Sequence, residues 1–173
     1  WIRDLDAYDG KTVITTENTE FNLFLIETSR GCGRHCRFCM AGYCFRKPRH
    51  RSLDKLLSYL PQAKNLNKKV GLMGPAISDY PQINELCSYI RSQDMPMSVA
   101  SFRADSVTQE LVDALAQSGQ RTLTLAPGAG SEKIRHIINK GIEEEHLFKS
   151  ISMGINAGVK NYRLYIMVGL PNE

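Results

Sequence analysis

Short apolar runs alternate with longer segments that carry apolar residues at helical spacing, from residue 21 to residue 173. The runs that predict strands cover residues 21–27, 69–73, 97–101, 122–126 and 161–168. Parallel neighbours need long crossovers, and each gap between these runs is long enough to hold a helix. The pattern therefore predicts an α/β fold, a barrel-like parallel sheet of about five strands with outer helices.

The helix expected before the second strand has a signal at each end. Ser52 is a suitable N-cap, and the four leucines between residues 53 and 60 recur at helical spacing. Pro61 follows directly and is expected to end the helix. One face of this helix must then pack against apolar side chains, and the strand at residues 69–73 supplies part of that surface.

Four further helices are predicted from the same kinds of signal. They are expected to begin near Pro81, at Ser106 or Thr108, at Ser131 and at Glu143. Three glycines are expected to end helices, namely Gly119, Gly141 and Gly158. Every irregular Gly, Pro or Cys stretch lies at the carboxyl end of a predicted strand, where ligands of such folds collect. We therefore expect these stretches to converge on one mouth.

Residues 1–20 are polar and acidic, and we interpret them as an N-terminal lead-in with a short strand near residues 12–16. Residues 21–173 then form one domain. The N-terminus lacks the pattern of a signal peptide, and no apolar run approaches the ~20 residues that span a bilayer. Five cysteines, an odd number with three close together, argue against a disulfide framework. A soluble protein of the reducing cytoplasm is expected.

The net charge of +4 comes largely from a basic run at residues 46–51. Such a run is usually a solvated loop, here leading into a helix. It could instead steer a polyanion or a phosphorylated substrate toward the mouth. Only Tyr43 and Phe45 lie nearby for base stacking, so the aromatic interleaving typical of nucleic-acid sites is thin.

Three thiols follow the first predicted strand at a Cys-x-x-x-Cys-x-x-Cys spacing, as Cys32, Cys36 and Cys39. A four-iron, four-sulfur cluster is usually held by four thiolates, so three clustered cysteines leave one iron open to a small molecule. Two alternatives stay open, a zinc site completed by Cys44 or His35 and ordinary unliganded thiols.

The two other cysteines are not expected to be ligands. A fourth thiolate from Cys44 would block the open iron, so we interpret this residue as a bystander. Cys87 falls on the apolar face of the helix that begins near Pro81, where it behaves as a small core residue. The four histidines are scattered and receive no role.

The cysteine spacing, with the aromatic Phe38 just before the last cysteine, resembles the signature of the radical S-adenosylmethionine superfamily. The resemblance implies a 4Fe-4S cluster whose open iron is chelated by the amino and carboxylate groups of S-adenosylmethionine. It also implies that an electron from a donor such as flavodoxin or ferredoxin cleaves the cofactor to a 5′-deoxyadenosyl radical.

A closer resemblance covers nearly all of the chain. It rests on the segments Glu27–Cys32, Ala41–Tyr43, Ser78–Pro81, Arg121–Pro127 and Leu164–Pro171. Together they look like a subgroup usually preceded by a cobalamin-binding domain, although no Asp-x-His-x-x-Gly stretch occurs here. The superfamily barrel typically has six strand–helix units, so this chain is expected to be a partial TIM-like barrel that lacks the last unit. Its exposed sheet edges are expected to favour self-association.

The resemblance assigns roles to residues at the expected strand ends. Cys32, Cys36 and Cys39 match the cluster ligands. The positions that match cofactor contacts are Phe38 near the adenine, Gly74 and Pro75 near the methionine amino group, Ser101 and Arg103 near the substrate or the cofactor carboxylate, Lys140 near that carboxylate, and Gly169 beside the adenine. No catalytic residue and no substrate can be named.

One position departs from the subgroup. A glutamate that binds the ribose hydroxyls usually follows Ala-Pro, and this chain has Gly128 there. Ribose binding would then fall to backbone groups or to Ser131, and weaker binding of S-adenosylmethionine is expected.

Three functions remain open from the sequence. The first is a radical enzyme core that acts on an unidentified substrate. The second is a methylthiotransferase-like enzyme that modifies RNA or protein, favoured by the basic run at residues 46–51 and expected to bind RNA in a salt-sensitive way. The third is a non-catalytic interaction module stabilised by zinc or by a cluster.

Overall fold

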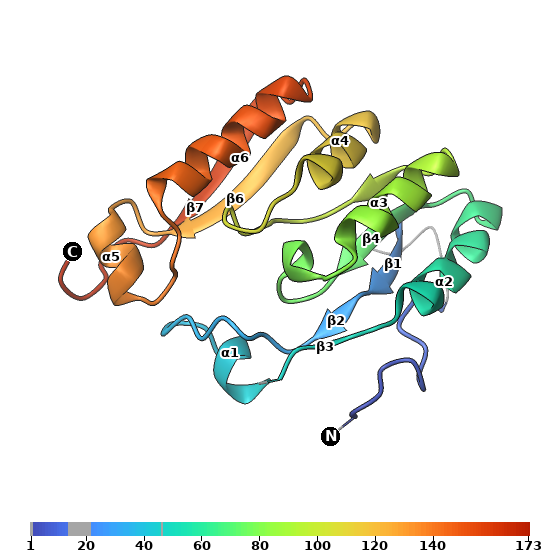
Figure 1. The fold of residues 1–173 in the computed structure, drawn as a ribbon, viewed down its shortest axis with the longest axis horizontal. Coiled ribbons are helices and arrows are strands. Elements are labelled where there is room, and N and C mark those ends of the chain that lie inside the picture. The colour runs from blue at the N-terminus through green and yellow to red at the C-terminus, as the bar shows by residue number, and fades with distance from the viewer. Residues whose placement is uncertain (1, 14–21, 46) are drawn as a thin grey trace.

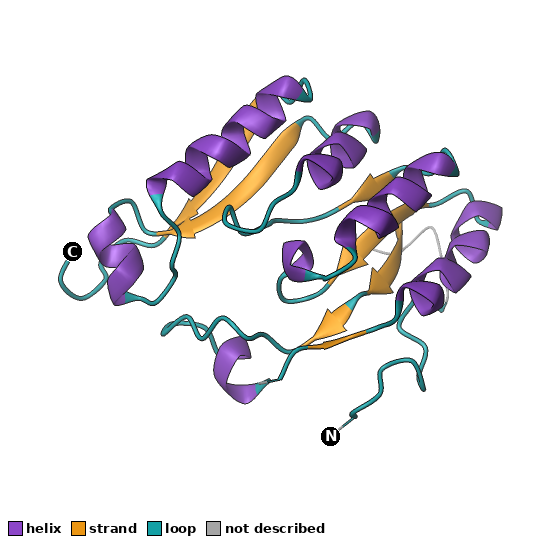
Figure 2. Ribbon diagram, viewed as in Figure 1, coloured by secondary structure: helices purple, strands orange, loops and turns teal. Residues whose placement is uncertain are grey.

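The structure is a computed structural model, and it describes residues 2–13, 22–45 and 47–173. The strands follow the inner side of an open arc, and helices lie along its outer side (Figures 1 and 2). The helices are α1 (Ala41–Cys44), α2 (Leu53–Asn65), α3 (Ile83–Ser92), α4 (Gln109–Gln117), α5 (Glu132–Ile137) and α6 (Glu144–Asn156), with a 3₁₀ turn η1 (Ile77–Asp79). The strands are β1 (Leu23–Glu27), β2 (Ser29–Arg30), β3 (Arg49–His50), β4 (Lys69–Met73), β5 (Met97–Ser98), β6 (Thr122–Gly128) and β7 (Asn161–Ile166).

The main strands are parallel and follow one another in chain order, as the sequence predicts. Strands β1, β4 and β5 form one sheet, and β6 pairs with β7 in a second. A parallel bridge between Phe102 and Leu125 joins the two sheets. Within the described residues the strands form an open arc and no closed barrel.

The core lies between the strands and the outer helices. Alternate residues of β1, such as Phe24 and Ile26, are fully buried against the helices. The faces of α3 and α4 that the leucine and isoleucine spacing predicts are buried too, for example at Leu86 and Leu111. The core also contains Cys87, as the sequence predicts, and burial raises the pKa of its thiol to about 12.

Helix α2 contradicts the expectation that Pro61 ends it. The helix continues to Asn65, and Pro61 is exposed on its outer side. An interior proline costs about 3 kcal/mol because it removes one backbone hydrogen bond and crowds the preceding turn. The buried face extends past the proline to Ala63, and packing of this last turn outweighs that local cost.

Several expected strand boundaries were wrong. The first strand begins at Leu23 and not at residue 21, and the last ends at Ile166 and not at residue 168. The third strand is shorter than predicted, with only Met97 and Ser98 in the ladder, because the chain then turns to pair Phe102 with β6. The fourth is longer, since β6 passes through Pro127 to Gly128 after an irregularity in its pairing with β7.

The N-terminal segment packs along the free edge of β1. Lys11 forms an antiparallel bridge with Ile26, and the Leu5 side chain is buried. Most of the strand expected near residues 12–16 lies outside the described residues, and so does Phe21. None of the helices in the described part of the chain combines the length and apolar character that crossing a bilayer requires.

Strand β7 pairs with β6 on one side, and its side chains are open to solvent, with Tyr165 52% and Ile166 47% exposed. Self-association through this edge stays a prediction. We expect sedimentation of residues 1–173 to show a dimer at high concentration, and Ile166→Lys to shift it toward monomer because a charge blocks edge pairing. The same change at Ile155, exposed on α6, is the matched control. A monomer at every concentration would contradict this prediction.

Candidate functional site

The cysteine loop begins where the main sheet ends and is held by a small hairpin that the sequence did not predict. Strand β2 pairs antiparallel with β3, so the chain leaves at Gly31 and returns at Arg49. Gly31 has a φ of +84°, and a Cβ there would overlap the Phe45 carbonyl. Only glycine suits this close approach. The loop is therefore closed at its base by backbone contacts.

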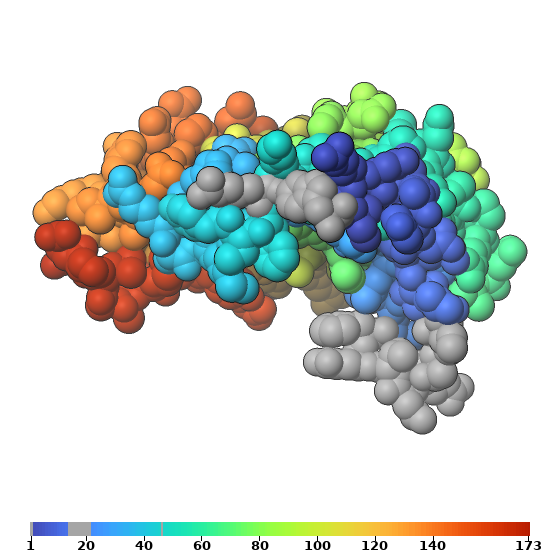
Figure 3. Space-filling model, turned by 90° about the horizontal axis from the view of Figure 1, so that it is seen from below, coloured from blue at the N-terminus to red at the C-terminus, as the bar shows by residue number. Residues whose placement is uncertain are grey.

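The far side of the loop is fastened to the end of α5. The backbone N–H of Arg37 donates to the Ile138 carbonyl at 2.8 Å. The Asn139 side chain donates to the His35 carbonyl at 2.9 Å. The cysteine loop thus spans from β1 to α5, across the carboxyl ends of the strands, and forms the middle of the surface in Figure 3.

The three cysteines of the motif are unlinked and face cationic side chains. Cys36 is buried, Cys32 and Cys39 are half-buried, and none of them forms a disulfide. Nη1 of Arg103 donates to Cys36 Sγ at 3.7 Å. Iron–sulfur clusters are held by cysteine sulfurs, and hydrogen bonds to those sulfurs are part of such sites. The donor set therefore fits such a cluster.

The arrangement does not form the zinc site that the sequence left open. Among the residues that the structure describes, no three His, Cys, Asp or Glu side chains form a group that could hold one metal ion. Cys44 is exposed on α1 and His35 is exposed on the loop. A four-iron cluster binds each thiolate to a different iron, so its ligands stand further apart than those of one ion.

A network of four charged side chains fastens the loop to the neighbouring strand ends. Arg34 donates from Nε and Nη2 to both carboxylate oxygens of Asp79, at 2.7 and 2.6 Å, and from Nη1 to Asp105 at 3.0 Å. Asp105 in turn accepts from Arg103 at 2.9 Å. Burial acts to raise the pKa of Asp79, but hydrogen bonds from Arg34 and Ser106 lower it overall.

An apolar cavity of about 390 Å³ opens between the cysteine loop and the ends of β6 and β7. Phe38 and Lys140 line it, with Lys140 Nζ 5.6 Å from the centre of the Phe38 ring. Burial and then the charge of Arg103 lower the pKa of Lys140, although the Cys36 and Cys39 side chains act in the opposite direction. Two residues that the sequence assigned to the cofactor thus share one cavity.

Gly128 lines the same cavity, and the structure gives a physical reason for the missing glutamate. Its φ is +88°, a conformation that glycine adopts at little cost. A Cβ there would lie 3.2 Å from Ile138 Cδ1 and 3.6 Å from Lys140 Cδ. A residue with a side chain is therefore strained at position 128, mainly through its φ. Ser131 caps α5 through the Ile134 N–H, so its hydroxyl already has a structural role.

A second, more polar cavity of about 320 Å³ opens beside Cys32. Arg34, His50, Ala76 and Asp79 are among its lining residues. It meets the segment just after Gly74 and Pro75, which are themselves exposed at the end of β4. Burial lowers the pKa of His50.

The remaining sequence-predicted positions lie further from these cavities. In the described part of the chain, Ser101 and Gly169 line neither of them. Gly169 lies in a turn after β7, where its N–H donates to the Glu173 carboxylate at 2.6 Å. The cofactor roles of Ser101, Gly169, Gly74 and Pro75 stay predictions.

Arg34, Asp79 and Asp105 belong to the site, although no pattern in the sequence marks them. Arg34 stands between two motif cysteines and Asp79 belongs to a segment that carried the resemblance, but neither received a role. Their pairing joins residues 45 and 71 positions apart, which no local pattern can show.

The basic run is only partly a solvated loop: Lys47 and His50 are exposed, Arg46 lies outside the described residues, and two arginines are engaged within the protein. The Arg51 side chain is fully buried, donates to Glu27 at 2.7 Å, and also donates to the Leu5 and Tyr8 carbonyls. Arg49 donates to the Ile2 carbonyl. Arg51 thus serves the packing of the N-terminal segment, because a buried charge must find partners.

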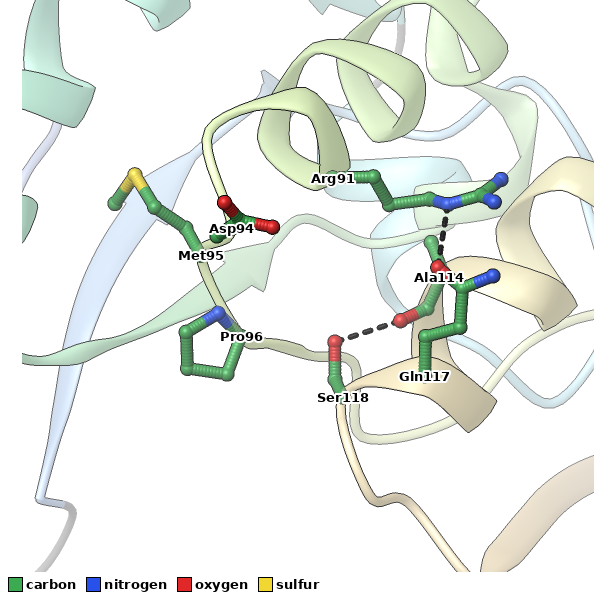
Figure 4. Close-up of a pocket in the computed structure, with 7 residues that line it drawn as sticks. All are labelled: Arg91, Asp94, Met95, Pro96, Ala114, Gln117 and Ser118. Carbon is green, nitrogen blue, oxygen red and sulfur yellow. Dashed lines mark hydrogen bonds between the residues drawn. The ribbon is translucent and has the colours of Figure 1, made fainter.

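A further cavity, of about 260 Å³, lies at the opposite end of the sheet (Figure 4). Residues at the ends of α3 and α4 line it. Two of them, Arg91 and Gln117, form a hydrogen bond of 2.8 Å. None of the motif residues reaches it, so it is not part of the candidate site.

Known proteins resemble this chain in sequence. The profile of the Radical SAM superfamily matches residues 26–173. The uncharacterized protein MJ0966 of Methanocaldococcus jannaschii is 40% identical over 171 residues, which cover 98% of this chain and 38% of that protein. The chain therefore spans well under half the length of this curated relative.

Two solved structures share the fold. The radical S-adenosylmethionine methyltransferase TsrM from Kitasatospora setae, with cobalamin and a [4Fe-4S] cluster bound, has a TM-score of 0.71 at 15% identity over 87% of this chain and 32% of that one. The cobalamin-dependent S-adenosylmethionine radical enzyme OxsB has a TM-score of 0.64 at 20% identity over 83% of this chain and 23% of that one. At these identities the similarity shows the fold alone, and it confirms the expected fold class.

Proposed function

Because this chain belongs to the radical S-adenosylmethionine superfamily, whose enzymes use a 4Fe-4S cluster and S-adenosylmethionine, we propose that Cys32, Cys36 and Cys39 hold that cluster. The observation that carries the proposal is the cysteine loop itself, fastened at both ends across the strand ends with Arg103 against Cys36. When bound, the cluster supplies the electron that cleaves S-adenosylmethionine to a 5′-deoxyadenosyl radical.

The cavity beside Phe38 is the best place for the adenosyl part of the cofactor. Phe38 offers an aromatic face for stacking, and Gly128 leaves the wall open. Lys140 presents its ammonium group to the same cavity and can bind a carboxylate. These residues orient the cofactor against the cysteine loop, and the apolar walls limit the access of water.

The reaction of the whole protein is a further proposal. TsrM is a methyltransferase and OxsB is cobalamin-dependent, so the fold allows more than one outcome. We expect hydrogen-atom abstraction from an unidentified substrate, with cobalamin supplied by a domain outside this chain if it takes part. Modification of RNA is less supported than the sequence suggested, because Arg51 is buried in an ion pair.

The test is reductive cleavage of S-adenosylmethionine by the anaerobically reconstituted protein. With dithionite as electron donor, we expect 5′-deoxyadenosine to form in proportion to bound cluster, because the electron alone cleaves S-adenosylmethionine and the radical, in the absence of its substrate, takes a hydrogen atom from the buffer components. Chromatography with mass detection measures the product. A protein that carries a four-iron cluster but forms no 5′-deoxyadenosine and binds no S-adenosylmethionine would favour the non-catalytic alternative.

Restoring the carboxylate at position 128 is expected to fail. Gly128→Glu should lower the free energy of unfolding by about 1–3 kcal/mol, because a non-glycine residue is strained at this φ and its Cβ meets Ile138. The affinity for S-adenosylmethionine should fall or stay unchanged. Thermal unfolding and equilibrium dialysis measure both, and Gly130→Glu, where a Cβ meets nothing within 4 Å, is the control. Tighter cofactor binding by Gly128→Glu would contradict the account.

A further inference from the structure

Arg103 is a buried cation whose partners lie almost entirely within the protein. It is 8% exposed and lies in the loop after β5. Its Nε and Nη2 donate to the two carboxylate oxygens of Asp105 at 3.0 and 2.9 Å, and Nη2 also donates to the Lys140 carbonyl at 2.7 Å. Nη1 donates to Cys36 Sγ at 3.7 Å. The guanidinium is therefore held in one orientation, with one end directed at a cysteine of the motif.

Asp105, which orients Arg103, is itself hydrogen-bonded to a residue of the cysteine loop. Asp105 accepts from Arg34 at 3.0 Å, and Arg34 pairs with Asp79 through two hydrogen bonds. The Asp105 side chain is 11% exposed and the Asp79 side chain 23% exposed. Hydrogen bonds between charged groups of low exposure are stronger than surface pairs. Movement of Arg103 would therefore break contacts on three segments at once.

The four side chains of this network, without Cys36, carry no net charge. Two arginines face two aspartates, so the network as a whole places little net charge beside the loop. The end of Arg103 that reaches Cys36 is nevertheless positive. An anionic sulfur at Cys36 then has the Arg103 guanidinium as a direct hydrogen-bond donor in a buried site.

We propose that Arg103 is a positioning residue that fixes the Cys36 sulfur and raises the reduction potential of the cluster bound there, with Asp105 and Arg34 holding its guanidinium. The inference rests on the proposed function, in which Cys36 is a cluster ligand. It gives Arg103 a different role from contact with a substrate or cofactor carboxylate, because most of its donors are already engaged.

The physical reason is the charge that reduction adds. An electron makes the cluster and its thiolates more negative, and hydrogen bonds and positive charge at the ligand sulfurs stabilise that state. Loss of the Arg103 donor therefore makes reduction harder. The effect acts on the potential of the resident cluster and needs no substrate.

The experiment is a redox titration, followed by electron paramagnetic resonance, of the anaerobically reconstituted protein and its Arg103→Gln variant. We expect Arg103→Gln to titrate at a more negative potential and Arg103→Lys to recover part of the shift by keeping the charge. Arg91→Gln is the matched control, since Arg91 pairs with Glu110 at 2.7 Å. Arg91 lines the cavity at the opposite end of the sheet (Figure 4). The potential of this variant should equal that of the unaltered protein.

An unchanged potential in Arg103→Gln, or an equal shift in Arg91→Gln, would overturn the proposal. Should Arg103→Gln fail to fold, Arg103→Lys decides the matter, because it keeps the positive charge but loses the oriented guanidinium N–H that donates to Cys36 Sγ. A smaller shift in the same direction is then expected, and an unaltered potential would again overturn the proposal. A starting protein that takes up no four-iron cluster would instead overturn the proposed function, before any variant is compared.

Discussion

Alanine at Cys32, Cys36 or Cys39 is expected to abolish cluster binding, reducing the iron content after reconstitution from about four per chain to below about one. The three thiols lie on one loop fastened at both ends, so the remaining two cannot rearrange to replace the missing ligand. Formation of 5′-deoxyadenosine should fall to background in each variant. Iron and sulfide assays, together with the visible absorbance of the cluster, measure the result.

Cys44→Ala provides the control for these variants. Cys44 is exposed on α1, only a few residues from Cys39, and the structure gives it no place in the proposed cluster site. We expect this variant to bind iron as the unaltered protein does. Loss of iron in Cys44→Ala alone, with full binding in Cys36→Ala, would show that the ligand assignment is wrong.

Replacing Arg51 by Met is expected to lower the free energy of unfolding by about 3 kcal/mol, or the melting temperature by about 6–12 °C. The Arg51 side chain is fully buried and joins Glu27 to the N-terminal segment through the Leu5 and Tyr8 carbonyls. Its loss leaves these acceptors short of a donor, which costs more than the ion pair itself contributes.

Thermal and urea unfolding measure this loss, with Arg91→Met as control. The Arg91 side chain is 31% exposed in its pair with Glu110, and such pairs contribute at most about 1 kcal/mol. Equal losses in the two variants would contradict the buried role of Arg51.

The pH dependence of the Arg51 effect follows from Glu27. Burial acts to raise the pKa of Glu27, but hydrogen bonds from Arg30 and Arg51 lower it below its ordinary value of 4.5. A carboxylate whose pKa is lowered in the folded state stabilises the fold fully above pH 4.5, and this stabilisation is lost as the pH falls through the folded pKa. The stability difference between the unaltered protein and Arg51→Met should therefore narrow below pH 4.5. A difference that widens on acidification would contradict this assignment.

Local signals predicted the regular elements well. Ser52, Thr108 and Ser131 cap helices as expected, each through a hydrogen bond to a backbone N–H in the first turn. These signals depend on neighbouring residues, so the sequence displays them directly. Pro61 does not end α2, because tertiary packing of the last turn decides where this helix ends.

The candidate site was predictable only where its residues share a motif. The spacing of the three cysteines and of Phe38 places them on one loop, and the strand order brings Lys140 and Gly128 to the same cavity. The partners of Arg34 and Arg51 come from distant segments, and their burial depends on the completed fold. Composition alone could not show that Arg51 is the buried member of the basic run.

The most direct test is electron paramagnetic resonance of the anaerobically reconstituted, reduced protein with and without S-adenosylmethionine. The account predicts a four-iron signal that changes when S-adenosylmethionine is added, because three cysteine ligands leave one iron open to it. A four-iron signal that is indifferent to S-adenosylmethionine, or no such signal after reconstitution, would contradict the assignment of Cys32, Cys36 and Cys39 to a cofactor-binding cluster.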